Sequence, residues 1–289
     1  MAELNTNKRL FLIDGYGFLF RAYHSLPPLT TPDGKPVGAI YGFTNMLIKL
    51  KNRVETSHLE TDTYILLVLD SGRASFRNDI YPEYKAHRPD APEDLKPQFP
   101  MIRDVAKAIN IEVAEKIGFE ADDIIAAYTK KAQVEGYKVT IVSTDKDLMQ
   151  LVDDGEVEML DPMRDRKITS KEVFEKFGVK PDKVLDVLSL MGDASDNIPG
   201  VPGIGPKTAS DLINKFDTLE NLLENIADIP QEKRRETLFH NRENAVLSKK
   251  LAALDFNAPT DTPIEQLRFK KVDENILKEY LLSLGFKSI

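Results

Sequence analysis

The chain has 289 residues and a formal net charge of −8, from 39 lysines and arginines against 47 aspartates and glutamates. It contains no cysteine, which excludes disulfides, a thiolate nucleophile and cysteine-ligated metal sites. No apolar run is long enough to cross a membrane and the N-terminus is too polar for a signal peptide, so we expect a cytoplasmic protein. The acidic balance argues against a surface coated with basic charge for nucleic acid.

The first half of the chain alternates strand-like apolar runs with helical patterns. Strands are expected over residues 9–13, 64–69, 138–143 and 157–160, and a helix over 37–54. Because the strands are apolar on both faces and separated by helices, they predict an α/β fold with a mostly parallel sheet flanked by helices.

Aspartates follow three of these strands. Asp14, Asp70 and Asp145 each stand at or just beyond a carboxyl end. In an open parallel sheet these ends meet at one edge, where functional groups gather. We therefore expect the three side chains to lie close together.

Further acids extend this group to nine candidate metal ligands: Asp14, Asp70, Glu120, Asp122, Asp123, Asp145, Asp147, Asp193 and Asp196. Taken one cluster at a time, they would suit helix N-termini, and capping is the simpler interpretation. If they converge, repulsion of roughly 1–4 kcal/mol per close pair requires bound cations or raised pKa values. Hard cations with oxygen ligands fit, and the excess of acids favours two Mg²⁺ ions, with Mn²⁺ as an alternative.

The segment 71–100 interrupts the α/β pattern with five prolines and mixed charge. Cations stand beside aromatic rings in it: Arg73, Arg77, Lys85 and Arg88 with Phe76, Tyr81 and Tyr84. That mixture suits single-stranded nucleic acid, although a solvated charged loop is an equal alternative. On a helix, Tyr84, Lys85 and Arg88 would share one face and could clamp a phosphate.

Helical patterns dominate after a boundary near residue 180, over 181–191, 206–216, 231–254 and 274–284. Between the first two, Gly200, Gly203 and Gly205 alternate with prolines just before a helix. Such a helix–hairpin–helix can hold DNA phosphates on backbone N–H groups without reading bases, and Lys207 and Thr208 are candidate phosphate contacts. A plain interhelical turn with proline at the first helical position is the alternative.

Together these residues resemble the 5′-nuclease (flap endonuclease) family, most closely the N-terminal 5′→3′ exonuclease domains of bacterial DNA polymerase I. The resemblance covers nearly the whole chain. Its motifs, in order, are FLIDGYGFLFRAYH, YPEYKAHRP, GFEADDIIAA, STDKDLMQLV and GDASDNIPGVPGIGPKTA. It implies a PIN-like nuclease core over 1–180 with a helical arch at about 71–100, then a helical DNA-binding region over 181–289.

The resemblance also implies roles for single residues. The nine acids look like the carboxylates around two Mg²⁺ ions, and Lys85 and Arg88 like the arch cations that engage the scissile phosphate. Tyr84, Arg73 and Arg77 are similarly placed catalytic candidates, and a K⁺ ion is expected at the hairpin. The implied activity is that of a structure-specific 5′→3′ exonuclease and 5′-flap endonuclease of replication and repair.

Two other functions stay open: a non-catalytic protein that binds DNA junctions, and an RNA-directed PIN-type nuclease. The expected partner is DNA with a 5′ flap or a single-strand/duplex junction. We expect a monomer that acts without a membrane. The chain fits either a stand-alone nuclease or a part of a longer DNA polymerase I.

Overall fold

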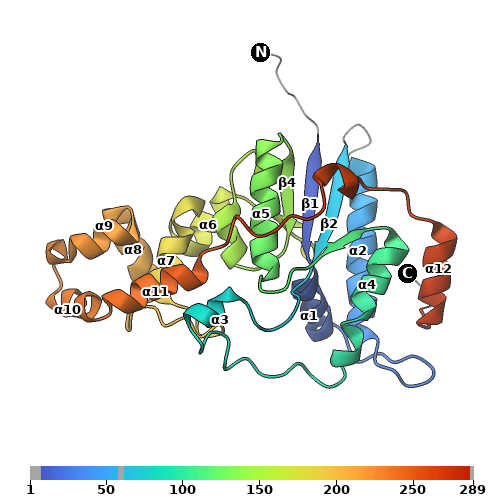
Figure 1. Cartoon of the computed structure of the whole chain (residues 1–289), viewed down its shortest axis with the longest axis horizontal. Coiled ribbons are helices and arrows are strands. Elements are labelled where there is room, and N and C mark those ends of the chain that lie inside the picture. The colour runs from blue at the N-terminus through green and yellow to red at the C-terminus, as the bar shows by residue number, and fades with distance from the viewer. Residues whose placement is uncertain (1–7, 58–61, 287–289) are drawn as a thin grey trace, which may run out of the picture.

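The computed structural model describes residues 8–57 and 62–286 (Figure 1). Its centre is a six-stranded sheet in the order β3-β2-β1-β4-β5-β6. The strands are β1 (Arg9–Asp14), β2 (Thr63–Val68), β3 (Glu112–Ala114), β4 (Lys138–Val142), β5 (Val157–Asp161) and β6 (Arg166–Ile168). All neighbours pair in parallel except β5 and β6. The predicted parallel sheet is therefore present, with an antiparallel edge strand added.

Helices surround the sheet and form a separate group at one end of the molecule. Those of the first part are α1 (Gly15–Ser25), α2 (Gly38–Ser57), α3 (Phe76–Ile80), α4 (Met101–Ile109), α5 (Ala121–Val134) and α6 (Ser170–Phe177). The later ones are α7 (Val184–Met191), α8 (Pro206–Phe216), α9 (Leu219–Glu224), α10 (Glu232–His240), α11 (Arg242–Ala252) and α12 (Glu274–Ser283). Among the described residues, none of these helices has the length and apolar character needed to span a membrane.

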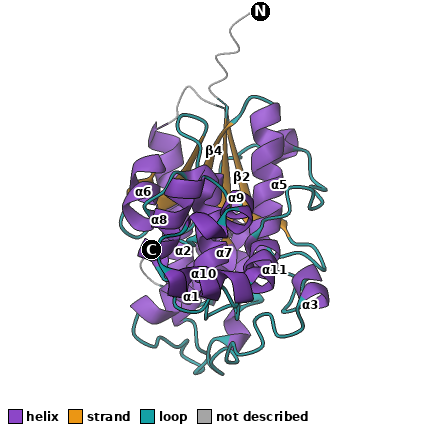
Figure 2. Ribbon diagram, turned by 90° about the vertical axis from the view of Figure 1, so that its left-hand side faces the viewer, coloured by secondary structure: helices purple, strands orange, loops and turns teal. Residues whose placement is uncertain are grey.

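Alternation along β1 shows how the sheet is covered. Leu10 and Leu12 point to one face and belong to the same apolar cluster as Ile125 of α5. Phe11 and Ile13 point to the other face, where the helices α1, α2 and α4 pack. Figure 2 shows helices on both sides of the strands. This two-sided cover explains why the strands are apolar without interruption.

One apolar cluster joins the sheet to the later helices. It runs from Leu12 in β1 through Ile125 in α5 to Leu188 in α7, Ile213 in α8 and Leu251 in α11. The helical end of the molecule is therefore packed on the same core as one face of the sheet.

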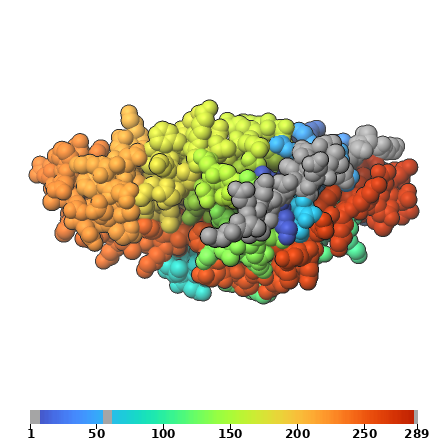
Figure 3. Space-filling model, turned by 90° about the horizontal axis from the view of Figure 1, so that it is seen from above, coloured from blue at the N-terminus to red at the C-terminus, as the bar shows by residue number. Residues whose placement is uncertain are grey.

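The C-terminal part is helical, as predicted, and the chain after α11 also returns to the sheet. The Phe269 amide donates to the Thr63 carbonyl of β2 at 2.8 Å, and the Tyr128 hydroxyl of α5 donates to the Thr262 carbonyl at 3.0 Å. Helix α12 packs beside α4, with Leu281 buried in the second cluster. Figures 1 and 3 show this red segment at the end opposite α8–α10.

Candidate active site

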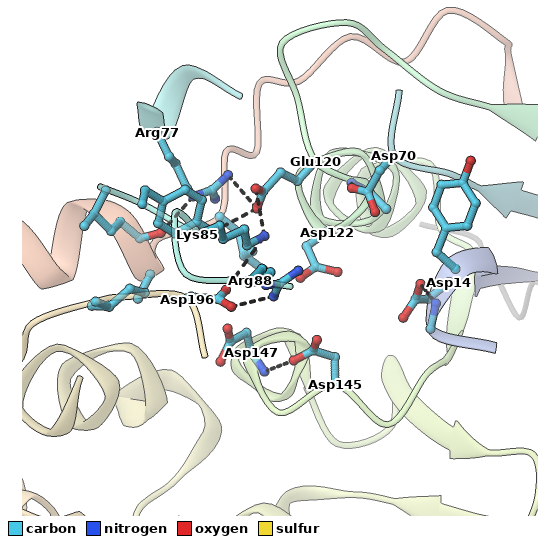
Figure 4. A pocket seen from close by; sticks show the side chains of 18 of the residues that line it. Asp14, Asp70, Arg77, Lys85, Arg88, Glu120, Asp122, Asp145, Asp147 and Asp196 are labelled. Atoms are coloured by element: carbon cyan, nitrogen blue, oxygen red, sulfur yellow. Dashed lines mark hydrogen bonds and ion pairs between the residues drawn. The ribbon is translucent and has the colours of Figure 1, made fainter. Parts of the chain in front are cut away.

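The carboxyl edge of the sheet opens into a cavity of about 180 Å³. Asp14, Asp70 and Asp145 follow β1, β2 and β4, and all three line it. Seven acids of the predicted nine share this cavity: Asp14, Asp70, Glu120, Asp122, Asp145, Asp147 and Asp196. Figure 4 shows them facing a common space, with Lys85 and Arg88 among them. The predicted convergence at the sheet edge is present.

Asp14 is built into the junction between β1 and α1. Its Oδ1 accepts the Gly17 amide and its Oδ2 accepts the Ser143 hydroxyl, both at 2.9 Å. A Cβ at position 17 would lie 2.1 Å from Asp14 Oδ2, so only glycine fits there. Burial, together with the charges of Asp145 and Asp70, raises the pKa of Asp14 to about 6, although these two hydrogen bonds act to lower it.

Three more cavity acids have raised pKa values. Burial, followed by the charges of Asp145 and Asp14, holds the pKa of Asp122 well above its ordinary value. Burial and the charge of Asp145 raise the pKa of Asp147 to about 7. Burial also raises the pKa of Asp70, although the Ala121 amide donates to it at 2.8 Å. The carboxylates of the cavity therefore repel one another, and a bound cation or proton would relieve this repulsion.

One oxygen in this group lacks any partner. Asp147 Oδ1 is buried and makes no hydrogen bond, which is costly for a carboxylate oxygen. Over residues 8–57 and 62–286, however, no three acidic or histidine side chains stand ready-made around a single metal position. The donor set is present, but its members are spread around the cavity.

Cations of the 71–100 segment neutralise part of the cavity. Lys85 Nζ lies 2.8 Å from Glu120 Oε1 and 3.7 Å from Asp196 Oδ2. The Arg88 guanidinium lies 2.5 Å from Asp196 Oδ1. The Tyr84 hydroxyl donates to Glu120 Oε2 at 3.1 Å. These three predicted catalytic side chains thus reach the acids, and a fourth, Arg77, lies 3.4 Å from Glu120 Oε2.

The backbone that carries these cations is not the predicted helix. Residues 82–87 form consecutive turns, and Lys85 adopts a left-handed φ of 57° while its amide donates to the Asp196 carbonyl at 2.9 Å. Within 71–100 the structure has only α3 and a short 3₁₀ turn, Lys96–Gln98. The prolines of this segment lack the N–H that a continuous helix requires. The prediction of one shared helical face was wrong.

Asp123 does not line the cavity, which corrects its place in the predicted ligand set. It is fully buried, and its two oxygens accept both NH groups of Arg77 at 2.7 Å. The backbone amides of Glu120 and Asp255 donate to the same oxygens. Arg77 also donates to the Leu251 carbonyl, so this pair ties α3 and α5 to the end of α11. Asp123 is therefore part of the wall behind the cavity, whereas Arg77 both binds Asp123 and lines the cavity.

Two further candidates lie outside the cavity. Asp193 is bound by Lys146 Nζ at 2.5 Å and by Ser195; these contacts lower its pKa although burial opposes them. Arg73 is largely exposed and lies 2.5 Å from Asp90. The Ser195 hydroxyl lies 2.6 Å from Asp193 Oδ1 and 3.4 Å from Asp196 Oδ1, so the two acids are near each other although only Asp196 lines the cavity.

The glycines of the hairpin between α7 and α8 have two different roles. A Cβ at Gly200 would lie 2.5 Å from the Gly192 nitrogen, so Gly200 closes the turn against the chain. Gly203 and Gly205 are exposed with open space around them, and Pro206 starts α8. Lys207 is exposed beside them and Thr208 is half-buried. A phosphate can approach Gly203 and Gly205, but not Gly200.

Aromatic rings form a part of the cavity that the sequence analysis missed. Tyr16 and Phe20 line it, and both pack against Phe99, with ring centroids 5.3 and 5.8 Å apart. Their positions two and six residues after Asp14, on the helix that Asp14 caps, were the available signal. These rings offer a stacking surface next to the acids.

Comparison with known families identifies the chain. A 5′-3′ exonuclease N-terminal resolvase-like domain matches residues 9–178, and a 5′-3′ exonuclease C-terminal SAM fold matches residues 179–275. The chain belongs to the 5′-3′ exonuclease family. Its PIN-like sheet and its helical C-terminal part have the fold of this family.

Individual relatives agree with this assignment. DNA polymerase I of Rhizobium leguminosarum is 44% identical over 290 residues, covering 100% of this chain and 28% of the polymerase. The chain therefore spans less than a third of that relative. The 5′-3′ exonuclease of Aquifex aeolicus is 40% identical over 98% of this chain and 94% of its own length. The solved T5 5′-exonuclease with divalent metal ions (zinc) bound has the same fold, with a TM-score of 0.69 at 22% identity, over 96% of this chain and 98% of its own.

Proposed function

We propose that this chain is a structure-specific 5′→3′ DNA exonuclease and 5′-flap endonuclease that hydrolyses phosphodiester bonds with divalent metal. One observation carries the proposal: seven acids, Lys85 and Arg88 line one cavity at the carboxyl edge of the sheet. A phosphodiester carries negative charge into its cleavage, so a site that cuts it needs fixed positive charge and a way to generate hydroxide.

The donor set fits Mg²⁺, with Mn²⁺ as an alternative. Its members are carboxylates, the ligands that hard cations prefer, and four of them have raised pKa values that a cation would relieve. Asp147 Oδ1 is buried without a partner, as an oxygen reserved for a ligand would be. We assign the seven cavity acids as the residues that would hold two ions. When bound, such ions supply an activated water and stabilise the leaving oxygen.

The chain's own side chains position the substrate. Lys85 and Arg88 are bound to Glu120 and Asp196 in the cavity, and they can transfer to a phosphate as charge-assisted donors. Tyr16 and Phe20 can stack a base beside the acids. Each of these contacts is independent of base identity, which suits an enzyme that selects by structure.

The exposed glycines of the hairpin give the duplex a second attachment. Gly203 and Gly205 expose backbone at the start of α8, where free N–H groups and the helix dipole favour a phosphate. Lys207 adds a positive charge there. We propose that this hairpin holds duplex DNA while the single strand reaches the cavity. A K⁺ ion at the hairpin stays a prediction, tested by comparing DNA affinity in K⁺ and Na⁺.

The proposal is tested by cleavage of labelled 5′-flap DNA. We expect Mg²⁺-dependent cleavage near the junction that excess EDTA abolishes and that Asp145→Asn reduces far more than it reduces DNA affinity. Asp182→Asn is a matched control, since Asp182 is an exposed acid away from the cavity. Undiminished cleavage in EDTA would overturn the mechanism.

The same assay separates the two alternative functions. Flap binding without cleavage at any Mg²⁺ or Mn²⁺ concentration would identify a junction-binding protein. Faster cleavage of an RNA flap than of the matched DNA flap would identify an RNA-directed nuclease. We expect neither result, because the acids are in the cavity and the hairpin suits a regular duplex.

A further inference from the structure

A second cavity adjoins the first, on the other side of two of its acids. It has a volume of about 370 Å³ and shares Asp14, Gly17 and Asp145 with the first cavity. Its remaining wall brings three cations together from separate elements: Arg21 of α1, Lys146 after β4 and Lys176 of α6.

Arg21 is held rigidly in the wall of this second cavity. Its NH1 donates to Thr144 Oγ1 at 2.7 Å, its NH2 to the buried Asp161 at 3.1 Å, and its Nε to Met163 Sδ at 3.0 Å. These contacts use three of the five N–H donors of a guanidinium. The other two have no partner among the residues the structure describes. A fixed fork with free donors is well suited to a phosphate oxygen.

Lys176 supplies positive charge without a carboxylate partner. Lys146 is already bound to Asp193 at 2.5 Å, whereas Lys176 makes no ion pair within 8–57 and 62–286. Burial lowers the pKa of Lys176, and the charge of Asp145 only partly offsets this. An anion bound beside the Lys176 ammonium would stabilise its charge, which burial has deprived of hydration.

The second cavity adjoins the segment that leads into the hairpin. Lys146 lines this cavity, and its Nζ lies 2.5 Å from Asp193, which stands two residues after the end of α7 on the way to Gly200. A DNA strand with one phosphate among the acids and its duplex on the hairpin must pass this wall. Every nucleotide of the strand brings one phosphate charge. The second cavity is thus placed to receive a phosphate next to the scissile one.

We propose that the second cavity binds a backbone phosphate of the cleaved DNA strand, on the duplex side of the scissile linkage, through Arg21 and Lys176. This inference rests on the proposed function, since it concerns the same substrate. It gives the enzyme a positioning site: one phosphate fixed beside the scissile phosphate sets where along the strand the cut falls. Arg21 and Lys176 are positioning residues here and not catalytic ones.

The test combines one protein change with one DNA change. Lys176→Ala is compared with Lys171→Ala, an exposed lysine of the same helix that pairs with Glu175. Each protein cuts 5′-flap DNA carrying a neutral methylphosphonate at one of the first two linkages on either side of the cut. Single-turnover assays give the protein concentration at half-maximal rate and the plateau rate. Melting temperatures confirm that each variant is folded.

We expect Lys176→Ala to raise the half-maximal concentration roughly five- to tenfold at 0.1 M salt with little change in the plateau rate, and to reduce the salt slope by about 1. One methylphosphonate on the duplex side should weaken binding by the wild type and should have a clearly smaller effect on Lys176→Ala, in which only Arg21 still contacts that phosphate. Lys176→Arg should restore binding. The cut should also spread to neighbouring linkages when the contact is lost.

Two outcomes would overturn the inference. In one, Lys176→Ala behaves like Lys171→Ala. In the other, every methylphosphonate has the same effect in Lys176→Ala as in the wild type, so that no contact passes through Lys176. In both cases the wild type still cuts flap DNA and the proposed function stands. Failure of the wild type to cut any flap would instead count against the proposed function.

Discussion

Asp122 and Asp123 are neighbours in the first turn of α5, yet they occupy opposite environments. Asp122 faces the cavity, where burial and other acids raise its pKa and the described residues give it no hydrogen bond. Asp123 faces the core, where four donors from Arg77 and two backbone amides satisfy it. The first is destabilised by its surroundings and the second is stabilised by them.

This difference separates acids kept for a ligand from acids kept for the fold. A carboxylate with all its lone pairs used cannot bind a metal without breaking the wall behind it. A buried carboxylate without hydrogen-bond or ion-pair partners lowers the stability of the protein until a cation binds to it. The comparison makes opposite predictions for the same substitution at adjacent positions.

The largest expected effect is on catalysis. Asp122→Asn should lower the single-turnover cleavage rate of 5′-flap DNA roughly 10²–10³-fold, because it removes a charge from the proposed metal site. Its DNA affinity should stay within error of the wild type, and its urea-unfolding midpoint without metal should be higher, because burial and the neighbouring acids disfavour the Asp122 charge. A fully active Asp122→Asn enzyme would remove the distinction between the two positions.

The next effect is on stability. Asp123→Asn should lower the free energy of unfolding by roughly 3–5 kcal/mol, because the buried Arg77 loses its two-pronged carboxylate partner and keeps only the longer contact to Glu120. Urea unfolding by circular dichroism measures this loss. Arg77→Met/Asp123→Leu, which removes both charges, should recover much of it. If Asp123→Asn melts like the wild type but no longer cuts DNA, Asp123 belongs with the ligands after all.

A smaller effect should appear in the pH dependence of stability without metal. The folded-state pKa values of Asp14, about 6, and Asp147, about 7, lie above the ordinary value of 3.8. The stability contributed by their protonated forms is complete below about pH 4 and is lost as pH rises to about 7. Millimolar Mg²⁺ should therefore raise the melting temperature by several degrees at pH 8 and by less at pH 5. Asp147→Asn should reduce this difference, and equal Mg²⁺ shifts at both pH values would contradict it.

The smallest effect concerns the cations that now neutralise the cavity. Lys85 Nζ contacts an oxygen of Glu120 that the proposed metal site also needs. Lys85→Met should therefore tighten Mg²⁺ binding roughly two- to fivefold in calorimetric titration while it weakens cleavage. Lys96→Met, whose lysine pairs with exposed Glu93, is the control and should leave Mg²⁺ binding unchanged. Weaker Mg²⁺ binding by Lys85→Met would show that the cation does not compete.

Much of the fold could be predicted from the sequence because its signals are local. The apolar runs became β1, β2, β4 and β5, and the helix expected over 206–216 is α8 with the same bounds. The strands β3 and β6 have three residues each, too few for a periodicity to register. The expected helix 231–254 is broken at Asn241, which ends α10 and precedes α11. The helix α12 was found, but its spacing did not reveal that α4 would be its partner.

The site was predictable in its chemistry and less so in its orientations. Asp14, Asp70 and Asp145 share an edge because strand ends do, which is a property of topology. That Asp122 turns to the cavity and Asp123 to the core depends on Arg77, 46 residues earlier in the chain. The approach of Lys85 depends on a left-handed residue between prolines, which a helical template cannot represent. Such long-range pairings carry no signal in a single sequence.

The apolar cluster that joins β1 to α7, α8 and α11 has a consequence for how the molecule comes apart. A hinge between two parts of a protein requires few contacts between them. Here the sheet and the helices α7, α8 and α11 share buried core side chains. Heating or urea should therefore melt the sheet and the hairpin region in one cooperative transition, with no state in which one survives alone. The distance between the acidic cavity and the hairpin is then fixed by the packing of the core.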